Sequence, residues 1–535
     1  MSSTKSSSKQ KGRSSFRSAK DGRDPSLAKT KSGLLLDLDG SHLDLLTTLT
    51  YLSCISTANV TREQLFEAGA RLGYMPSPYF AQVANLVQSL GYDFSHACHV
   101  VSETCPDEVM KQFLLRMGNS MASGEAEPTF LMRETAVVME DYTNSYERDV
   151  ETLRKWTDAF VALMVSCNLV VLVSLISNMI YNLGLVFIVI VEIVSIVSAA
   201  MGAWLIYRMA PFDPLVHKLP DKCREQLLMT KMSWVLFPLA ALAAVTSYLA
   251  IHQIGVSMVL IGIIIVPVGI VNLKLEGKVD SRDRDIADFL RALGGVTGAR
   301  SSTVIESLDH IDRRAIGSLE MELKRLLIRV HAGLSTVKCW GRFMADTGSE
   351  LIHRTVRCFW DANDLGGDPD KIGKMSSDMA LRVSLLRAKR KLVSSTFTYV
   401  IIPMHLALIG TLVFMSEVVT AFNGQLLKAQ AATQGEAPTS LNPDDLGIPG
   451  ALTFQSFNTS VVRTMVLVVV VALTLINGFA PRAASGGHSM KLALFGGITL
   501  ILSGLILLAV PPLAHSVFSS TLTDQPVPGT PSVSQ

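Results

Sequence analysis

The sequence is poor in charged residues and has no paired cysteine motif, and each shortage excludes a class of protein. Only 18% of its 535 residues are charged, against about 25% in a typical soluble domain. The formal net charge is +2, which excludes a globally basic nucleic-acid-binding protein. The seven cysteines are scattered without a CxxC pair, so we expect reduced thiols and no disulfide framework.

Long apolar runs take the place of the missing charge. Hydrophobic residues make up 49% of the chain, and the mean hydropathy is +0.35. Seven stretches reach the roughly 20 residues that a helix needs to cross a bilayer. We place them at 158–181, 185–207, 234–252, 255–273, 397–421, 461–480 and 492–513. The fold class is therefore all-α, a polytopic membrane protein with four transmembrane helices in two hairpins at 158–273 and three at 397–513.

The distribution of Lys and Arg predicts the orientation, because basic loops stay on the cytoplasmic side. The loop 208–233 carries five basic residues, and Arg387-Ala-Lys-Arg-Lys391 precedes the fifth span. By contrast, the loop 422–460 has one Lys and three acidic residues, and the tail 514–535 has a single charge. In the cytoplasmic membrane we thus expect a cytoplasmic N-terminus, an external loop 422–460 and an external tail 514–535.

The remaining residues form a tail and two blocks. Residues 1–31 hold nine basic and two acidic side chains without an apolar core, which predicts a disordered basic tail and no signal peptide. Residues 32–157 and 274–396 have helical periodicity and no strand signal, and each block runs into a span. We place helices near 42–57, 61–73, 77–90, 93–103, 106–122 and 127–156 in the first block, and near 281–296, 300–311, 314–331, 334–347, 349–363 and 370–396 in the second.

The two blocks are predicted to be repeats of one cytoplasmic six-helix bundle. They have nearly equal lengths and align at an offset of about 240 residues, which places Thr57 over Thr297. Both contain a glycine-then-proline break before the last helix, which is typical of a helix end followed by a new helix start. These repeat-defining breaks are Gly124 and Pro128 in the first block, and Gly366, Gly367 and Pro369 in the second.

The blocks differ in charge, with 8 basic and 17 acidic side chains in 32–156 and 22 basic and 17 acidic in 274–396. The difference indicates either different partners or docking of one block on the other, unless both surfaces are simply solvated. In the basic block, Leu323, Leu326, Leu327 and Val330 are spaced to face a core. Arg325 and Arg329 lie one turn apart on another face, which is either a partner contact or a solvated stripe.

One acidic residue falls inside a predicted span. Glu192 lies in the second span, and an intramembrane carboxylate is a candidate functional site, with His405 of the fifth span as a conceivable partner. The alternative is a hydrogen bond that holds helices together. We find no catalytic motif. His96, Cys98, His99 and Cys105 are close in sequence, but at most two of them are spaced to reach one metal ion. We therefore expect no enzyme activity, no metal and no cofactor.

Two helical blocks, each feeding a membrane helix, resemble the platform proteins of type IV pilus and type II secretion machines, the GspF, PilC and TadC family. The Gly/Pro breaks and the helix-opening turns Thr57–Thr61 and Thr297–Ser301 carry the resemblance. Four spans between the blocks and three after them are most similar to the archaeal version, the archaellum membrane proteins called FlaJ or ArlJ.

The resemblance implies a non-enzymatic platform of an archaellum or adhesive pilus machine, with roles in motility or protein secretion. A hexameric secretion ATPase would dock on the cytoplasmic bundles, and the platform, as a homodimer or homotrimer, would help move pilin-like subunits from the bilayer into the filament. No nucleic-acid partner is expected. The alternatives are a secondary transporter, another polytopic scaffold, or a membrane-bound signalling enzyme or receptor. A transporter would repeat its membrane halves, whereas here the soluble blocks repeat.

Overall fold

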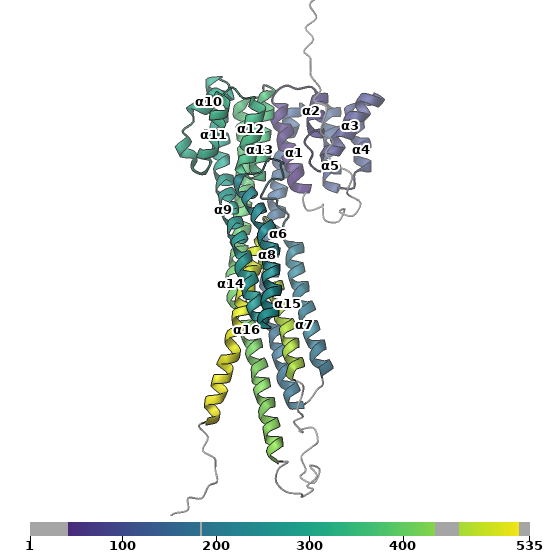
Figure 1. Cartoon of the computed structure of the whole chain (residues 1–535). Coiled ribbons are helices and arrows are strands. Elements are labelled where there is room, and N and C mark those ends of the chain that lie inside the picture. The colour runs from purple at the N-terminus through teal and green to yellow at the C-terminus, as the bar shows by residue number, and fades with distance from the viewer. Residues whose placement is uncertain (1–40, 182–184, 434–458, 524–535) are drawn as a thin grey trace, which may run out of the picture. The chain divides into compact units, whose positions relative to one another are not determined.

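The structure, a computed structural model, describes residues 41–181, 185–433 and 459–523, and these residues are almost entirely helical (Figure 1). No strand occurs among them, apart from one isolated β-bridge between Val216 and Ser349. In the first block and the first hairpin the helices are α1 Ser41–Ser56, α2 Arg62–Ala70, α3 Ser77–Leu90, α4 Phe94–Thr104, α5 Glu108–Ser123, α6 Glu127–Tyr181 and α7 Leu185–Met209. They are followed by α8 Arg224–Ile251, α9 Ile254–Arg300, α10 Val304–His310, the 3₁₀ helix η3 Arg313–Leu319, α11 Glu320–His331, α12 Thr336–Thr347, α13 Glu350–Asp364, α14 Pro369–Thr433, α15 Thr459–Ser485 and α16 Lys491–Thr523.

Seven of these helices are long and apolar enough to cross a membrane, namely α6, α7, α8, α9, α14, α15 and α16. They confirm the predicted all-α class with seven spans. The predicted tail 1–31 lies outside the described residues. The regions predicted as an external loop and an external tail both begin in helix, since α14 continues to Thr433 and α16 to Thr523.

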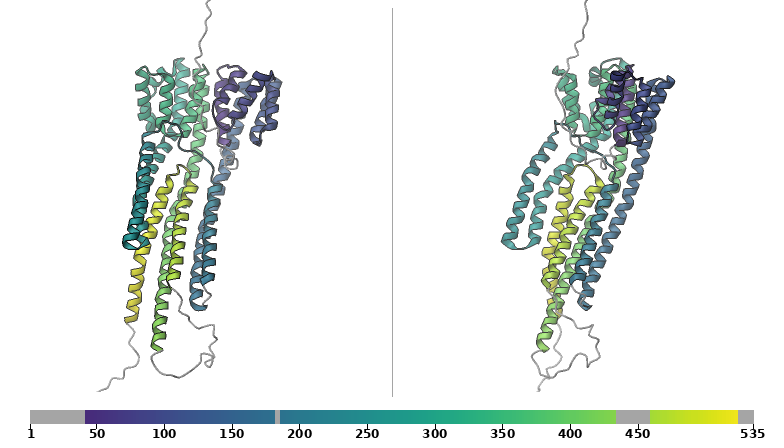
Figure 2. Two further views of the ribbon diagram at one scale, coloured as in Figure 1. Left: turned by 45° about the vertical axis from the view of Figure 1, so that its right-hand side comes forward. Right: turned by 90° about the vertical axis from the view of Figure 1, so that its right-hand side faces the viewer.

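Three helices, α6, α9 and α14, run without interruption from a block into an apolar span (Figure 2). The block boundaries expected at 157, 274 and 396 therefore fall inside helices. For α9 the prediction was wrong, because we expected its cytoplasmic helix to begin near 281. The intervening segment 274–280 is charged, yet charged residues such as Lys and Glu are good helix formers, so the helix continues through it.

The first block consists of α1 to α5 and the start of α6, with helix ends within three residues of those predicted. Thr61 caps α2, because its side-chain oxygen accepts a hydrogen bond from the main-chain N–H of Gln64. Gly124 ends α5 in the left-handed conformation. Pro128 then lies in the first turn of α6, where its missing N–H costs no hydrogen bond. This first Gly/Pro break is a helix end and a helix start, as the pattern predicts.

The second block combines one half of α9 with α10 to α13 and the first half of α14. The single helix expected at 314–331 is instead η3 followed by α11, because Gly317 has non-helical dihedrals with φ of 50°. In α11 the periodicity prediction holds, since Leu323, Leu326 and Leu327 are buried and Val330 is partly buried against the same core. The equivalence of the two blocks as repeats stays a prediction.

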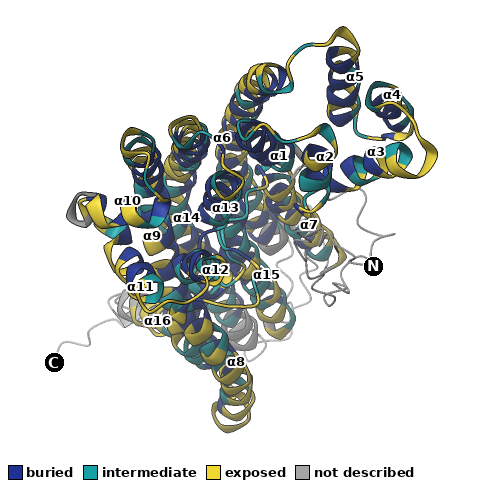
Figure 3. Ribbon diagram, turned by 90° about the horizontal axis from the view of Figure 1, so that it is seen from above, coloured by how far each residue is buried: buried dark blue, intermediate teal, exposed yellow. Residues whose placement is uncertain are grey.

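The two blocks pack directly on each other, and their buried apolar side chains form one continuous core. Helix α1 contacts α13 and α14, and Figure 3 shows α1 and α13 side by side with mostly buried residues. Asp44 of α1 accepts a hydrogen bond from Arg354 Nη1 at 2.7 Å, and Tyr51 donates to Asp361 Oδ2 at 3.0 Å. Of the possibilities left open by the charge difference, docking of one block on the other is thus observed.

Candidate functional site

A cluster of buried charges lies where α9 and α14 pass from the second block to their apolar spans. We call it the boundary cluster and define it as Asp213, Glu276, Asp283, Arg387 and Arg390. Asp213 belongs to the loop 210–223 between α7 and α8, Glu276 and Asp283 to α9, and both arginines to α14. The cluster therefore joins three segments that are far apart in the sequence.

Arg387 is the centre of the boundary cluster. Its guanidinium binds both oxygens of Asp213, from Nε at 2.8 Å and from Nη2 at 2.7 Å, and its Nη1 donates to Asp283 at 2.6 Å. The three side chains are at most 10% exposed. A bidentate pair in such a site fixes the relative positions of its two segments, because the planar guanidinium admits little angular freedom.

The two carboxylates respond differently to the same arginine. Burial opposes ionisation of both, but the bidentate contact with Arg387 outweighs it at Asp213, so the pKa of Asp213 lies below its ordinary value. At Asp283 burial dominates over the single contact with Arg387 and the hydrogen bond from Ser349, and raises the pKa to about 6. Asp213 is thus the firmly ionised partner of the arginine.

Arg390 binds carbonyl groups at the ends of two other membrane helices. Its Nη1 donates to Pro211 O at 2.7 Å, just beyond α7, and its Nε donates to Ala484 O at 3.2 Å, in the last turn of α15. A cation favours the carbonyl end of a helix, so one guanidinium stabilises two helix ends at once. Gly486 leaves room for it, since a Cβ at that residue would lie 2.5 Å from Arg390 Nη2.

Glu276 ties the turn between α15 and α16 to α9. Its carboxylate accepts a hydrogen bond from His488 N at 3.1 Å and pairs with Lys491 Nζ at 2.7 Å. Gly487 has φ of 78° and would carry a Cβ only 2.5 Å from Glu276 Oε1, so glycine is required there on two grounds. The boundary cluster thereby connects α7, α9, α14, α15 and α16.

The loop 210–223 extends from the boundary cluster to the second block, and we call it the strut. Leu215 O accepts from Glu350 N at 3.1 Å, and His217 N donates to Gly348 O at 3.3 Å. Ser349, in the same α12–α13 turn, donates its hydroxyl proton to Asp283. The strut therefore links the first membrane hairpin to the second block through main-chain hydrogen bonds.

In chemical terms the boundary cluster holds segments together. It borders a cavity of about 310 Å³. The carboxylates of the cluster and its cavity are paired, since Asp280 binds Lys391 in addition to the pairs above. Among the described residues no group of three or more His, Cys, Asp or Glu side chains could hold a metal ion. Paired charges of this kind position helices. Sequence reasoning treated Arg387–Lys391 only as an orientation signal, because their partners lie more than 90 residues away in the sequence.

The structure does not bring the two intramembrane candidates together. His405 is fully buried among α14, α15 and α16, where Nε2 faces Ser503 Oγ at 2.8 Å and Nδ1 faces Asn477 Nδ2 at 3.0 Å. Both ring nitrogens of His405 thus lie within hydrogen-bond distance of a polar side chain from a neighbouring helix. Glu192 lies in α7, is 5% exposed and has a buried Oε1 without a hydrogen-bond partner in the structure. His405 thus links three helices through polar contacts, whereas Glu192 lies on α7 and does not contact His405.

The two candidate arginines of α11 also differ from each other. Arg325 is exposed, and its Nη2 lies 3.4 Å from Met321 Sδ. Arg329 is turned toward α12, where it pairs with Asp346 at 2.6 Å and is 24% exposed. Only Arg325 therefore faces outward as a stripe residue would.

The second Gly/Pro break is a contact between the blocks as well as a helix junction. Gly366 has φ of 84° after α13, and Pro369 begins α14. Between them, a Cβ at Gly367 would lie 2.6 Å from Thr57 Oγ1 of the first block, and the same hydroxyl accepts from Asp368 N at 3.3 Å. This break thus positions the first block against the start of α14.

Fold and site together define a class: a polytopic all-α membrane protein with two docked helical blocks tied to the ends of its spans. Within that class the chain is similar to two curated proteins, both named Flagella accessory protein J. The protein of Methanocaldococcus jannaschii is 25% identical over 318 residues, which are 57% of this chain and 56% of the relative. The protein of Methanococcus voltae is 25% identical over 296 residues, 53% of each chain.

These matches support a relationship to Flagella accessory protein J, in line with the resemblance found in the sequence. The chain spans little more than half of the length of these curated relatives. No family model matches the chain, and no solved structure matches it significantly.

Proposed function

We propose that this protein is a membrane platform in the assembly of an archaellum or a related archaeal filament. The observation that carries the proposal is the similarity to two proteins named Flagella accessory protein J. The continuous helices α6, α9 and α14 support it, because movement of a block would pass directly to a membrane helix. In this role the chain has no enzymatic activity of its own, and the work comes from a separate hexameric secretion ATPase.

The ATPase docks on the second block in this proposal. That block carries the positive charge excess, and Arg325 lies exposed on its surface. The boundary cluster then passes the movement to five membrane helices, which helps pilin-like subunits leave the bilayer for the filament base. Buried ion pairs suit the transmission of movement, because they fix the relative positions of the helices that they join.

Deletion of the gene tests the proposed role. We expect cells without the protein to lack filaments in electron micrographs while filament subunits accumulate in the membrane fraction, and we expect the wild-type gene on a plasmid to restore the filaments. Normal filaments in the deletion strain would contradict the proposal and would favour the alternative, a transporter or an unrelated scaffold. Solute uptake measured in the same strain separates these two.

A further inference from the structure

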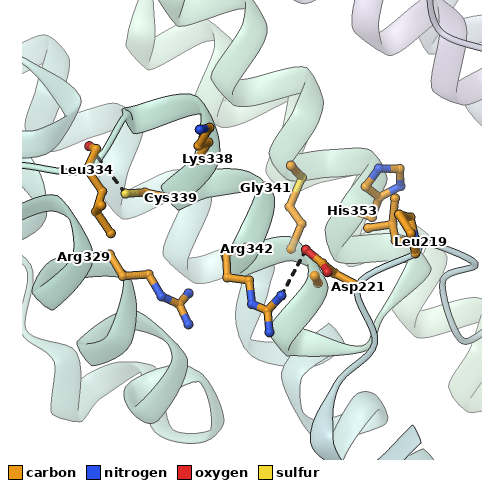
Figure 4. Close-up of a pocket in the computed structure, with 12 residues that line it drawn as sticks. Leu219, Asp221, Arg329, Leu334, Lys338, Cys339, Gly341, Arg342 and His353 are labelled. Carbon is orange, nitrogen blue, oxygen red and sulfur yellow. Dashed lines mark hydrogen bonds and ion pairs between the residues drawn. The ribbon is translucent and has the colours of Figure 1, made fainter. Parts of the chain in front are cut away.

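The second block contains a cavity of about 520 Å³ between α11, α12 and the strut (Figure 4). Arg329 of α11 lines one side, and Lys338 and Arg342 come from α12. Leu219, Pro220 and Asp221 of the strut line the opposite side. The cavity thus lies between the block proposed to dock the ATPase and the loop that leads to the boundary cluster.

The charges in this cavity are one carboxylate short. Arg329 pairs with Asp346 at 2.6 Å, and Arg342 pairs with Asp221 at 3.0 Å and with Asp346 at 3.5 Å. Lys338 has no ion pair among the described residues, and Arg329 Nη1 is buried without a hydrogen-bond partner. Three cations therefore share two carboxylates, and a buried N–H donor left without an acceptor is costly. An added anion beside Lys338 would supply the missing negative charge.

Exposed apolar side chains lie on the two helices that line the cavity and in the turn between these helices. Met321 and Ile328 of α11 are 61% and 60% exposed. Leu334, in the turn before α12, is 55% exposed, and Val337, in the first turn of α12, is 63% exposed. Arg325 lies against Met321. Outside the apolar spans, such a group of exposed large hydrophobic residues marks a protein interaction surface.

We propose that the cavity and this apolar surface bind an acidic segment of the assembly ATPase, with a carboxylate in the cavity and apolar side chains on α11 and α12. The proposal rests on the function proposed above. Charge complementarity selects the partner, because the site offers an unpaired cation next to apolar anchors and lies in the block with excess positive charge. Arg342 then exchanges Asp221 for the incoming carboxylate.

The exchange is favourable because the existing pair is weak. Arg342 and Asp221 are 45% and 64% exposed, and exposed pairs of this kind contribute little to stability. Asp221 lies in the strut, eight residues after Asp213 of the boundary cluster. Asp221 also lies three residues before α8, so docking at the cavity contacts the chain segment that leads into this membrane helix.

Binding of purified ATPase to the full-length protein in nanodiscs tests the proposal. We expect Lys338→Glu with Arg342→Gln to weaken binding at least tenfold, with a smaller effect at high salt because screening reduces the wild-type affinity. The matched control is Lys374→Glu with Lys371→Gln, since both lysines are exposed on the same block at the start of α14. We expect the control to bind within twofold of the wild type.

A second variant should change the affinity for the ATPase in the opposite direction. Asp221→Asn removes the competing carboxylate, so we expect it to bind the ATPase several-fold more tightly, which misfolding would not produce. Unchanged or weaker binding by Asp221→Asn would overturn the exchange, and equal losses in the cavity and control variants would overturn the site. If the variants bind as the wild type does, the cavity is excluded while ATPase docking stands. A wild type that does not bind at all contradicts both proposals.

Discussion

Arg387 and Arg390 are three residues apart on α14, yet they bind different groups. Arg387 satisfies two carboxylates, and Arg390 satisfies two main-chain carbonyls. Both tasks need a planar group with several fixed N–H donors, which lysine does not offer. At the scale of single residues, the structure therefore concentrates its constraints in guanidinium groups at the ends of the spans.

Replacement of Arg387 should destabilise the protein mainly because two buried carboxylates would lose their cation. We expect Arg387→Gln to lower the free energy of unfolding by about 3–5 kcal/mol, because Asp213 and Asp283 would remain buried without their cation. The control is Lys389→Gln, whose side chain is 59% exposed beside Glu147 and should matter by less than about 1 kcal/mol. Thermal unfolding in detergent measures both, and equal midpoints would refute the role of Arg387.

His353 of α13 gives a prediction for pH. Burial, helped by the nearby cations Arg357 and Arg354 and by His217, lowers its pKa to about 4. The unfolded chain therefore takes up this proton first. The stability that the neutral imidazole contributes is complete above about pH 6.5 and is lost as the pH falls toward 4.

We expect the free energy of unfolding of His353→Gln to fall less than that of the wild type as the pH is lowered from 6.5 to 4. The difference between the two proteins should grow to about 3 kcal/mol at most across that window. Unfolding midpoints recorded at half-unit steps of pH provide the measurement. Parallel curves for the two proteins would show that His353 does not titrate as its burial implies.

At the scale of elements, α9 and α16 cross with glycine on both sides of the contact. Gly255, Gly262 and Gly269 recur at every seventh residue of α9, and a Cβ at each would meet α16. At Gly262 it would lie 2.6 Å from Gly497 O, and at Gly269 it would lie 2.5 Å from Leu494 Cα. Backbones that approach this closely are typical of helix pairs in membranes.

A pair of alanine substitutions on α9 separates packing from helix propensity. Gly269→Ala should destabilise the protein by several kcal/mol, because the added methyl group meets backbone atoms that cannot rotate away. Gly277→Ala, on the same helix with nothing within 4 Å of its Cβ, should stabilise it by about 0.5–1 kcal/mol. Unfolding midpoints that move in the same direction would argue against a backbone contact between α9 and α16.

Sequence periodicity predicted the elements well and their contacts poorly. The ends of α1 to α5 agree within three residues, because Gly and Pro flank α3 to α5 and the capping residue Thr61 precedes α2. The continuous α9 was missed because charge in 274–280 looks the same in a loop and on a helix surface. The boundary cluster was missed for another reason: Asp213 and Arg387 meet only through the fold, and one sequence does not show which distant charges pair.

At the scale of the whole molecule, the orientation in the membrane follows from the loops and has a direct test. We expect the N-terminus and both blocks to be cytoplasmic, and the segment around residue 440 to be external. A membrane-impermeant maleimide should therefore label Ser440→Cys in intact cells and Ala332→Cys only after lysis. Labelling in the reverse order would invert the topology.

The native cysteines favour this experiment. Six of the seven are buried, and the seventh, Cys167, lies in the apolar part of α6. Ala332 is exposed next to Gly333, in the turn after α11, so a cysteine there should react freely once the reagent has access. The unsubstituted protein sets the background, which we expect to be low in both conditions.

The prolines inside the long helices give the two blocks different mechanical connections. An internal proline removes a main-chain hydrogen bond and makes a helix easier to bend at that point. Among the three continuous helices, α9 and α14 have such a proline, at Pro267 and Pro403, whereas α6 has only Pro128 in its first turn. The first block therefore continues into a helix without an internal proline, α6, whereas the second block continues into two helices that can bend at a proline, α9 and α14. Torque applied to the second block would then bend α9 and α14 at these prolines.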